Sequence, residues 1–207
     1  MRGAIVMAAG AGRRMGGRPK GLLRREGEPL VLRQVRLLRE AGLERVALVL
    51  GHHAEAIEAA LQAAGPLAGQ VRRVRNPAPD AGPGGSLRCG LAALGAEIQE
   101  VMVLLADQPL LEVQDLQAMQ AAWRERPAGV ELVFPQHDGQ PGHPIVFGAG
   151  LRALLLGSAA AGVREWRRAH PAQALAVPVA HARCTTDVDT PEDLVRLERA
   201  HGVRLEP

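Results

Sequence analysis

The stretch GAIVMAAGAGRRMGGRPKG (residues 3–21) decides the fold. It begins as a short apolar run, GAIVMAAG (3–10), which passes directly into a loop rich in glycine and arginine. The run has the length and composition of a buried β-strand. In open α/β sheets, ligands bind beyond the carboxyl ends of the strands. We therefore expect the loop that follows this strand to contact a ligand.

Two common phosphate-binding motifs do not fit this loop. The dinucleotide fingerprint GxGxxG accommodates Gly10 and Gly12 but requires a third glycine where the chain has Met15. The P-loop GxxxxGK[ST] requires a glycine before its lysine and a hydroxyl residue after it. Lys20 instead lies between a proline and a glycine. We exclude both motifs.

What remains is a wide glycine loop with four cationic side chains, Arg13, Arg14, Arg18 and Lys20. Lys20 is the only lysine of the chain, a scarcity that the codon bias of a GC-rich genome explains. Glycines let backbone N–H groups approach an anion, Arg14 can form a bidentate contact with phosphate oxygens, and Lys20 supplies a compact charge. A triphosphate is the natural occupant. The alternative is a flexible loop with ordinary surface arginines.

The rest of the chain alternates between apolar runs and helical periodicity, which predicts one α/β domain with a mainly parallel sheet covered on both faces. We expect Pro29 in the first turn of a helix and Gly42 just after its end. Thr190, Pro191 and Asp193 form the capping-box pattern of a last helix. The expected strands span 44–51, 70–76, 100–109, 130–135 and 174–180. The expected helices span 29–42, 53–65, 86–95, 113–126, 149–156, 162–169 and 190–202.

Composition excludes several classes of protein. The 207 residues are 47% hydrophobic, carry a net charge of +3 and include 2% aromatic residues, so few rings could stack on bases and we expect no nucleic-acid partner. No run of 18 apolar residues and no signal-peptide core is present, so we expect no membrane contact and a cytoplasmic location. Cys89 and Cys184 fit no metal motif and are expected to be small buried residues.

Acidic residues occur at two places where they could hold a metal ion. Asp107 follows the most hydrophobic run, so its carboxylate is well placed to bind Mg²⁺ against phosphates; the alternative is that it caps the next helix. Asp187 and Asp189 alternate along an extended segment and therefore share a face. Asp189 is the better candidate for a second ligand, although either residue could simply lie at the start of the last helix.

The loop NPAPDAGPGGSLRCGL (76–91) contains the only asparagine and one of two serines. Ser86 is expected at a helix N-terminus, where it either caps the helix or also binds a base or phosphate together with Asn76. Among the seven histidines, only His143, in GQPGHP, lies near a candidate site. The histidines and cysteines show no zinc-ligand spacing, so we expect no zinc.

The sequence resembles the nucleotidyltransferases that act on molybdenum cofactor, and most closely the molybdenum cofactor cytidylyltransferases. The resemblance is carried by segments in family order across nearly the whole chain: AAGAGRRMG with Lys20 (8–20), 76–91, LLADQPLL (104–111), GHPIVF (142–147) and DVDTPEDL (187–194). It implies a Rossmann-like, three-layer fold of the nucleotide-diphospho-sugar transferase type. It also implies Mg²⁺-dependent transfer of a nucleoside monophosphate, with a donor half near residues 1–110 and an acceptor half near 111–207.

The resemblance also implies roles for individual residues. Arg14 and Lys20 would contact the phosphates, Asp107 and the probable second ligand Asp189 would bind Mg²⁺, and His143 would lie on the acceptor side. The nucleotide would be bound by Ala8, Ala9, Gly10, Gly12, Arg14, Lys20, Asn76 and Ser86. Alanine at position 9, where the guanylyl branch has glycine, is similar to the cytidine-using branch and implies CTP as donor.

One segment departs from the family pattern. The cytidylyltransferases carry a GDxGAR-like stretch, whereas this chain has GSAAAGVREW (157–166), with Ser158 in place of the acid. The expectation that molybdopterin is the acceptor therefore depends on the resemblance of the other segments alone. The same resemblance implies a molybdoenzyme as a further partner. Two alternatives stay open: a cytidylyltransferase for a sugar, alditol or choline phosphate, and a chaperone of a molybdoenzyme that binds nucleotide without turnover.

Overall fold

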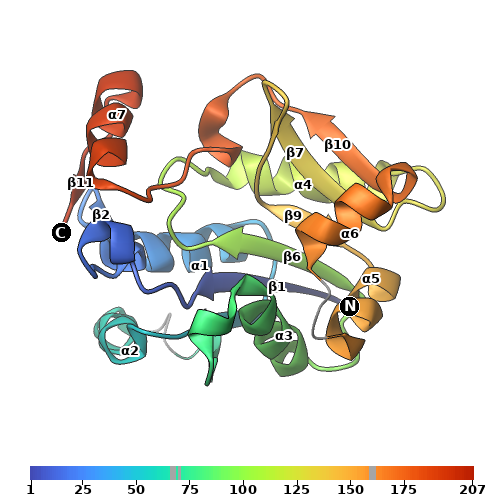
Figure 1. Ribbon diagram of the computed structural model, residues 1–207, viewed down its shortest axis with the longest axis horizontal. Coiled ribbons are helices and arrows are strands. Elements are labelled where there is room, and N and C mark those ends of the chain that lie inside the picture. Colours follow the sequence, from blue (N-terminus) through green and yellow to red (C-terminus); the bar gives the residue numbers. More distant parts are fainter. Residues whose placement is uncertain (66–68, 70, 159–161) are drawn as a thin grey trace.

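A computed structural model describes residues 1–65, 69, 71–158 and 162–207 of the chain. In these residues a central sheet has the strand order β10-β7-β9-β6-β1-β4-β5, with β8 paired to β7 (Figure 1). The strands are β1 (Arg2–Ala8), β4 (Val46–Leu50), β5 (Val71–Arg75), β6 (Glu100–Leu105), β7 (Leu132–His137), β8 (Gln140–Pro141), β9 (Ile145–Phe147) and β10 (Ala174–Pro178).

The sheet is mainly parallel, as predicted. β1 pairs in parallel with both β4 and β6, β4 with β5, and β10 with β7. β9 is antiparallel to both of its neighbours, β6 and β7, and joins the two parallel parts. The carboxyl ends of β1 and β6 therefore lie side by side at one edge of the sheet, which is where ligands bind in folds of this kind.

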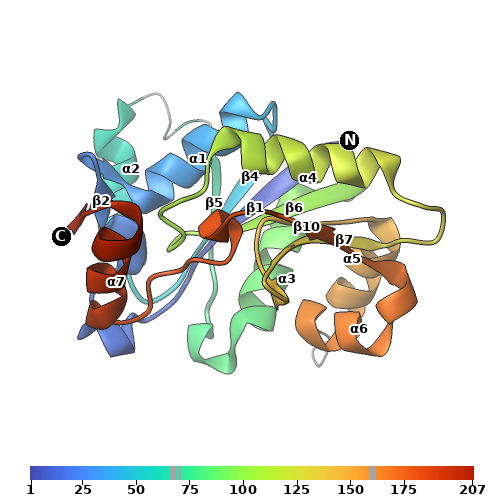
Figure 2. The same ribbon diagram turned by 90° about the horizontal axis from the view of Figure 1, so that it is seen from above.

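Helices cover both faces of the sheet and give the three-layer architecture (Figure 2). Alternate residues of β1 explain this: Ala4 and Val6 join the buried cluster on one face, and Ile5 joins the cluster on the other. The first cluster includes residues of α1 (Leu30–Glu40), α2 (Ala54–Ala63) and α4 (Val113–Glu125). The second includes residues of α3 (Pro83–Leu94), α5 (Ala149–Gly157) and α6 (Val163–Ala169).

A small second sheet, which the sequence did not predict, lies beside the carboxyl end of the main sheet. It has the order β11-β2-β3 and is made of β2 (Arg24–Arg25), β3 (Glu28–Pro29) and β11 (Leu205–Glu206). Together with α7 (Pro191–His201) it encloses a third buried cluster, which includes Met15 of the glycine loop and Val188. This cluster packs the chain's last segment against its first loop.

Several helix boundaries differ from the expectation. Pro29 ends β3 and stands just before α1 rather than in its first turn. α3 begins at Pro83, three residues before the predicted start, because the proline–glycine segment already winds into the helix. The capping box of α7 is confirmed: the N–H of Asp193 bonds to the Thr190 hydroxyl, and the Asp193 carboxylate accepts the Thr190 N–H. The predicted start of β5 at residue 70 and residues 159–161 of the acceptor region lie outside the described residues.

Two other expectations from composition can be compared with the structure. In the part of the chain that the structure describes, no helix is both long and apolar enough to cross a membrane. Both cysteines are free. Cys184 is buried, as predicted, whereas Cys89 is partly exposed on α3.

Candidate active site

The centre of the candidate site is an ion-pair cluster built around Lys20. Lys20 opens a short 3-10 helix (Lys20–Leu22) after the glycine loop, Asp107 follows β6, and Asp189 precedes α7. The Lys20 ammonium donates hydrogen bonds to Oδ2 of Asp107 and, over 2.7 Å, to Oδ1 of Asp189. The lysine side chain is 17% exposed, so these contacts are shielded from much of the solvent. Three residues that the sequence singled out therefore meet at one point.

The protonation states follow from this cluster. Burial alone would lower the pKa of Lys20, but the carboxylates of Asp107 and Asp189 outweigh it and raise the pKa above its ordinary value. Burial opposes ionisation of Asp189 too, yet Lys20 and Arg14 hold its pKa below the usual range. The ammonium and the Asp189 carboxylate are therefore both charged at neutral pH.

Asp187 lies close to this cluster but outside its ion pairs. Burial, together with the negative charges of Asp107 and Asp189, raises the pKa of its carboxyl group. The N–H of Val188 bonds to the carbonyl oxygen of Asp107 over 3.1 Å, which fixes this segment against the end of β6. Neither acidic side chain of the pair caps α7, because Thr190 is the N-cap and Asp193 completes the capping box.

The carboxylates suit a divalent cation in type but are not arranged as a metal centre. Across the described residues, no three or more His, Cys, Asp or Glu side chains are grouped so that they could hold a metal ion. Burial first, and then the negative charges of Asp107 and Asp189, raise the pKa of Asp187, so the three carboxyl groups are close enough to interact. Carboxylate oxygens are the ligands that Mg²⁺ and Mn²⁺ prefer. Asp107 and Asp189 therefore supply the type of oxygen ligand that such an ion prefers. To bind it, both carboxylates would have to release Lys20.

The glycine loop, predicted to be wide, has one position at which the backbone approaches itself closely. Gly12 has φ +62°, and a Cβ atom there would lie 2.0 Å from the carbonyl oxygen of Arg18, so only glycine fits. Gly10 is exposed. Arg14 reaches from this loop to Oδ2 of Asp189 over 2.7 Å, and Arg13 reaches to Asp80 over 2.7 Å. Three of the loop's four cations, Arg13, Arg14 and Lys20, therefore contact carboxylates, whereas Arg18 forms no ion pair among the described residues.

A cavity of about 70 Å³ opens between the loop and the sheet, where β1 and β6 end. Predicted site residues account for four of the residues that line it: Ala8, Gly10, Lys20 and Asp107. Ala9 is buried, and its carbonyl oxygen lies so close to Gly51 that a Cβ atom there would come within 2.4 Å. The backbone of the first strand is therefore fixed at the mouth of the cavity.

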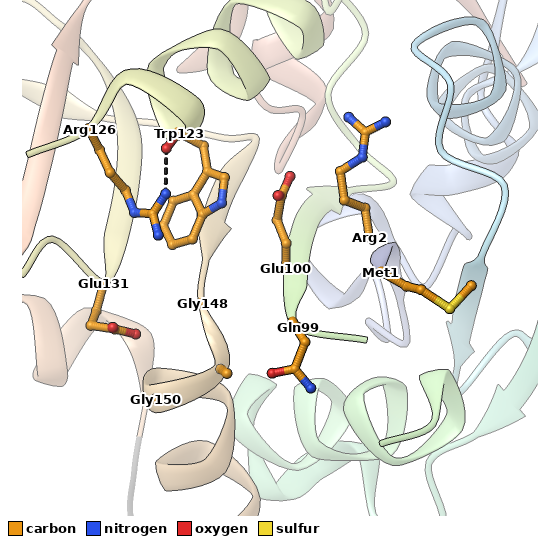
Figure 3. A pocket seen from close by; sticks show the side chains of 10 residues that line it. Met1, Arg2, Gln99, Glu100, Trp123, Arg126, Glu131, Gly148 and Gly150 are labelled. Carbon is orange, nitrogen blue, oxygen red and sulfur yellow. Dashed lines mark hydrogen bonds between the residues drawn. The ribbon is translucent and has the colours of Figure 1, made fainter. Parts of the chain in front are cut away.

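A larger cavity, about 420 Å³, opens at the opposite, amino ends of β1 and β6 (Figure 3). Its polar groups are engaged within the protein: the Arg126 guanidinium lies over the Trp123 ring at 3.5 Å and bonds to the Trp123 carbonyl oxygen. The carboxylate of Glu131 accepts a hydrogen bond of 3.4 Å from the N–H of Leu151 in the first turn of α5. Size alone does not make this cavity the candidate site, since the glycine loop and the acidic cluster lie at the other end of the strands.

Asn76 and Ser86, predicted to lie near the base, are buried and bond to each other. The Asn76 amide donates to the Ser86 hydroxyl over 2.9 Å and accepts the N–H of Ala78 over 3.0 Å. The prediction of Ser86 at a helix N-terminus is wrong, because Ser86 lies in the first full turn of α3 and Gly82 precedes the helix. Neither side chain lines the cavity, and their bonds instead fasten the start of the 76–91 loop to α3.

Asp107 does not cap a helix, which removes the alternative raised by the sequence. α4 is capped by Glu112, in a capping box with Asp115. A shared hydrogen-bond acceptor connects His143 to the end of β6. The carbonyl oxygen of Cys184 accepts the N–H of His143 over 2.8 Å and the side-chain amide of Gln108 over 3.0 Å.

Two side chains that fix the C-terminal segment at the site were not predicted from the sequence. Gln108 is 2% exposed, and its amide fastens the returning C-terminal segment to the end of β6. Arg183 binds both oxygens of the buried Asp115 carboxylate at 2.8 and 2.9 Å, which fixes the same segment to α4. Pairing between residues 68 to 76 positions apart leaves no local pattern, so no spacing rule could have found them.

The family described as a MobA-like NTP transferase domain matches residues 4–175. Nicotine blue oxidoreductase of Paenarthrobacter nicotinovorans is 30% identical over 200 residues, which are 93% of this chain and 94% of that protein. The bifunctional protein GlmU of Anaeromyxobacter dehalogenans (strain 2CP-1) is 38% identical over 130 residues. That match covers 62% of this chain and 26% of GlmU.

Solved structures share the fold along nearly the whole chain. Rv0371c of Mycobacterium tuberculosis H37Rv superposes with a TM-score of 0.75 at 25% identity, covering 95% of this chain and 96% of that one. A further structure of Rv0371c, at 26% identity, TM-score 0.69 and 95% and 97% coverage, is a complex with manganese. The nucleotidyl transferase Mth528 of Methanothermobacter thermautotroptrophicus gives a TM-score of 0.78 at 22% identity, covering 97% of each chain. Molybdopterin-guanine dinucleotide biosynthesis protein A of Archaeoglobus fulgidus gives 0.67 at 18% identity, covering 98% and 99%.

Proposed function

Because the chain belongs to the family of MobA-like NTP transferases and is a nucleotidyltransferase, we propose that it moves CMP from CTP to a phosphate-bearing acceptor. The acceptor we propose is molybdopterin, and the second product is pyrophosphate. The observation that carries this proposal is the Lys20 ammonium between the carboxylates of Asp107 and Asp189, at a cavity beyond the ends of β1 and β6. The proposal includes a cytoplasmic location, where CTP is available.

In the proposed reaction an oxygen of the acceptor's terminal phosphate attacks the α-phosphorus of CTP. The bond between the α-phosphorus and the bridging oxygen breaks, and pyrophosphate leaves with the electron pair. The attacking group is already an anion, so no enzyme nucleophile or general base is required. The barrier is mainly charge repulsion, which positioning and neutralisation reduce.

The cations of the glycine loop supply that neutralisation. Lys20 and Arg14 contact carboxylates, and an incoming triphosphate would compete for both groups. Contacts with the phosphates would then stabilise the charge that develops on the leaving pyrophosphate. The carboxylates released from these contacts, Asp107 and Asp189, are the residues that would hold Mg²⁺. That ion would polarise the phosphate oxygens and offset their charge.

The choice of CTP rests on Ala9, which is similar to the cytidine-using branch of the family. The solved neighbour from Archaeoglobus fulgidus is named for a guanine dinucleotide, so the donor base needs a direct test. Pyrophosphate release should be measured with each of the four NTPs, with Mg²⁺ or Mn²⁺, and with or without molybdopterin. We expect release with CTP only when molybdopterin is present.

The other results of this assay separate the alternatives. Release that needs a sugar, alditol or choline phosphate instead of molybdopterin would replace the proposed acceptor. Tight binding of CTP without release of pyrophosphate in any mixture would favour the non-catalytic chaperone. Equal rates with GTP would remove the role given to Ala9.

The name of one relative suggests a second candidate reaction. Nicotine blue oxidoreductase is similar over 93% of this chain, and an oxidoreductase of that name would need an electron donor. Against it stands the glycine loop, where Met15 replaces the third glycine of a dinucleotide-binding fingerprint. Oxidation of NADH or NADPH with a quinone-like dye, measured by the loss of nicotinamide absorbance, is the direct comparison. We expect no oxidation above the rate without protein.

A further inference from the structure

Helix α6 carries three arginines without a carboxylate partner. Arg164, Arg167 and Arg168 form no ion pair among the described residues. All 22 acidic residues of the chain lie within those residues, so the result covers every carboxylate side chain. Arg167 and Arg168 lie three and four positions after Arg164, about one helical turn away. Arg164 and Arg168 are exposed, whereas Arg167 is partly buried next to the buried Trp166.

Arg167 is the arginine that the fold holds in place. Its guanidinium lies 4.6 Å from the centre of the Phe134 ring, on the sheet face covered by α3, α5 and α6. The side chain is partly buried, and burial together with the charges of Arg168 and Arg164 lowers its pKa. A guanidinium that is partly desolvated and not neutralised by the protein favours an electron-rich partner from outside.

A chain of contacts joins the strand under Arg167 to the acidic cluster. Phe134, whose ring lies under the Arg167 guanidinium, is followed by Pro135, whose carbonyl oxygen accepts the N–H of Gly142 over 2.8 Å. The next residue, His143, donates its N–H to the Cys184 carbonyl oxygen, which also accepts the amide of Gln108. Gln108 directly follows Asp107, so these contacts connect the two regions.

Burial, together with the charge of Arg167, lowers the pKa of His143 to about 4. The imidazole is therefore neutral at physiological pH.

We propose that Arg167, with His143 beside it, binds the part of the acceptor that is remote from its attacking phosphate. The acceptor then carries a second electron-rich group, a carbonyl oxygen or a further oxyanion, which the guanidinium contacts through two parallel N–H donors. The neutral imidazole donates or accepts one more hydrogen bond. This inference rests on the proposed transfer reaction, because the acceptor must reach both Arg167 and the cluster of Lys20, Asp107 and Asp189.

The test compares Arg167→Ala with Arg168→Ala, a matched control that removes the same charge from an exposed place on the same helix. Arg167→Lys keeps the charge but loses the planar pair of donors. Binding of molybdopterin and of CTP should be measured separately by calorimetry, and acceptor KM and kcat by pyrophosphate release. We expect Arg167→Ala to weaken molybdopterin binding and raise its KM by at least about tenfold, with kcat and the Kd of CTP unchanged within about twofold. Arg168→Ala should change the acceptor KM by less than about threefold, and Arg167→Lys should recover only part of the loss.

Each outcome decides one of the two proposals. Transfer by the wild type with the same acceptor KM in Arg167→Ala and Arg168→Ala would overturn the role of Arg167 and leave the proposed function standing. Binding of molybdopterin that depends on Arg167 but yields no pyrophosphate would support the site and refute the transfer reaction. A wild-type protein that neither binds nor converts molybdopterin would refute both. A loss in CTP affinity instead of acceptor affinity would place Arg167 on the donor side.

Discussion

The cations of the glycine loop and those of helix α6 are treated by the fold in opposite ways. Lys20 contacts two carboxylates, Arg14 contacts Asp189, and Arg13 contacts Asp80. Arg167 lies over the Phe134 ring, whereas Arg164 and Arg168 are exposed on α6. Three of the loop's four cations therefore contact carboxylates, whereas the α6 arginines form no ion pair among the described residues.

Because of this difference, we expect the two regions to respond differently to a ligand. In the loop, an anionic ligand must displace carboxylates, so its binding is coupled to the release of groups that can then hold a metal ion. On α6, a ligand displaces water alone, because no carboxylate lies within ion-pair distance in the described chain. The predictions below test this contrast, from the largest expected effect to the smallest.

The largest effect is expected when the paired cluster loses one of its members. Lys20→Ala and Asp107→Ala should each lower turnover by roughly 10²–10³, because each removes a charge that offsets repulsion in the transition state. The measurement is kcat for pyrophosphate release at saturating CTP and acceptor. Far-UV circular dichroism and a thermal melt should show that each variant is folded. Near wild-type turnover of Asp107→Ala at saturating Mg²⁺ would refute the metal-binding role.

The lowered pKa of His143, to which the charge of Arg167 contributes, should make the free energy of unfolding depend on pH. The pKa of about 4 in the folded protein lies below the ordinary value of 6.5, so between these values the unfolded chain binds a proton that the folded chain does not. Stability is therefore complete above pH 6.5 and falls as the pH drops toward 4, by at most about 3 kcal/mol from this group. Urea denaturation at pH 7 and pH 4.5 measures this loss.

The matched variant for this prediction is His143→Gln, which cannot titrate. Other groups titrate equally in both proteins, so the difference between their pH-dependent losses isolates His143. We expect the wild type to lose about 2–3 kcal/mol more than the variant between the two pH values. Equal losses would show that His143 is not held neutral.

A smaller effect is expected for Arg14. Its side chain is 68% exposed, so water screens its charge more than that of Lys20. Arg14→Ala should weaken CTP binding by about tenfold, the value of one charge-assisted hydrogen bond, and the loss should shrink at high salt. Isothermal titration at two salt concentrations measures both effects. An unchanged Kd would mean that Arg14 stays with Asp189 when nucleotide binds.

The smallest effect is expected at the edge of the loop. Arg13 and Asp80 form an ion pair in which the side chains are 76% and 62% exposed. Arg13→Ala should therefore change the free energy of unfolding by less than about 1 kcal/mol. Urea denaturation of this variant beside Arg14→Ala provides the comparison. A loss well above that value would mean that the pair holds the loop closed, and the contrast with α6 would then need revision.

Local patterns in the sequence were enough to predict much of the fold. β1, the helices on both faces and the capping box of α7 follow from periodicity and from residue types that act over a few positions. Lys20, Asp107 and Asp189 could be singled out because Lys20 is the only lysine and ends the glycine loop, Asp107 follows an apolar strand, and Asp189 precedes a capping box. Their roles in catalysis stay predictions.

What the sequence could not give depends on contacts between distant segments. Ser86 was placed at a helix start because serine favours that position, but its hydroxyl instead accepts a bond from Asn76 inside the fold. In the small sheet β2 pairs with the last strand, β11, and no local spacing in the sequence indicates that pairing. The Gln108 and Arg183 contacts are of the same kind. Packing between distant segments determines these positions, whereas local propensity determines the strands and helices that were predicted correctly.

The hydrogen bond between Lys20 and Asp189 joins residues 169 positions apart, and this separation has a consequence for synthesis on the ribosome. A nascent chain can form β1, the glycine loop and Asp107 while its last part is still in the exit tunnel. Until residue 189 emerges, Lys20 has only one of its two carboxylate partners, and α7 has not yet covered Met15. The cluster of Lys20, Asp107 and Asp189 is therefore complete only after residue 189 has emerged, and a chain cut before that residue should bind CTP more weakly than a chain that contains it.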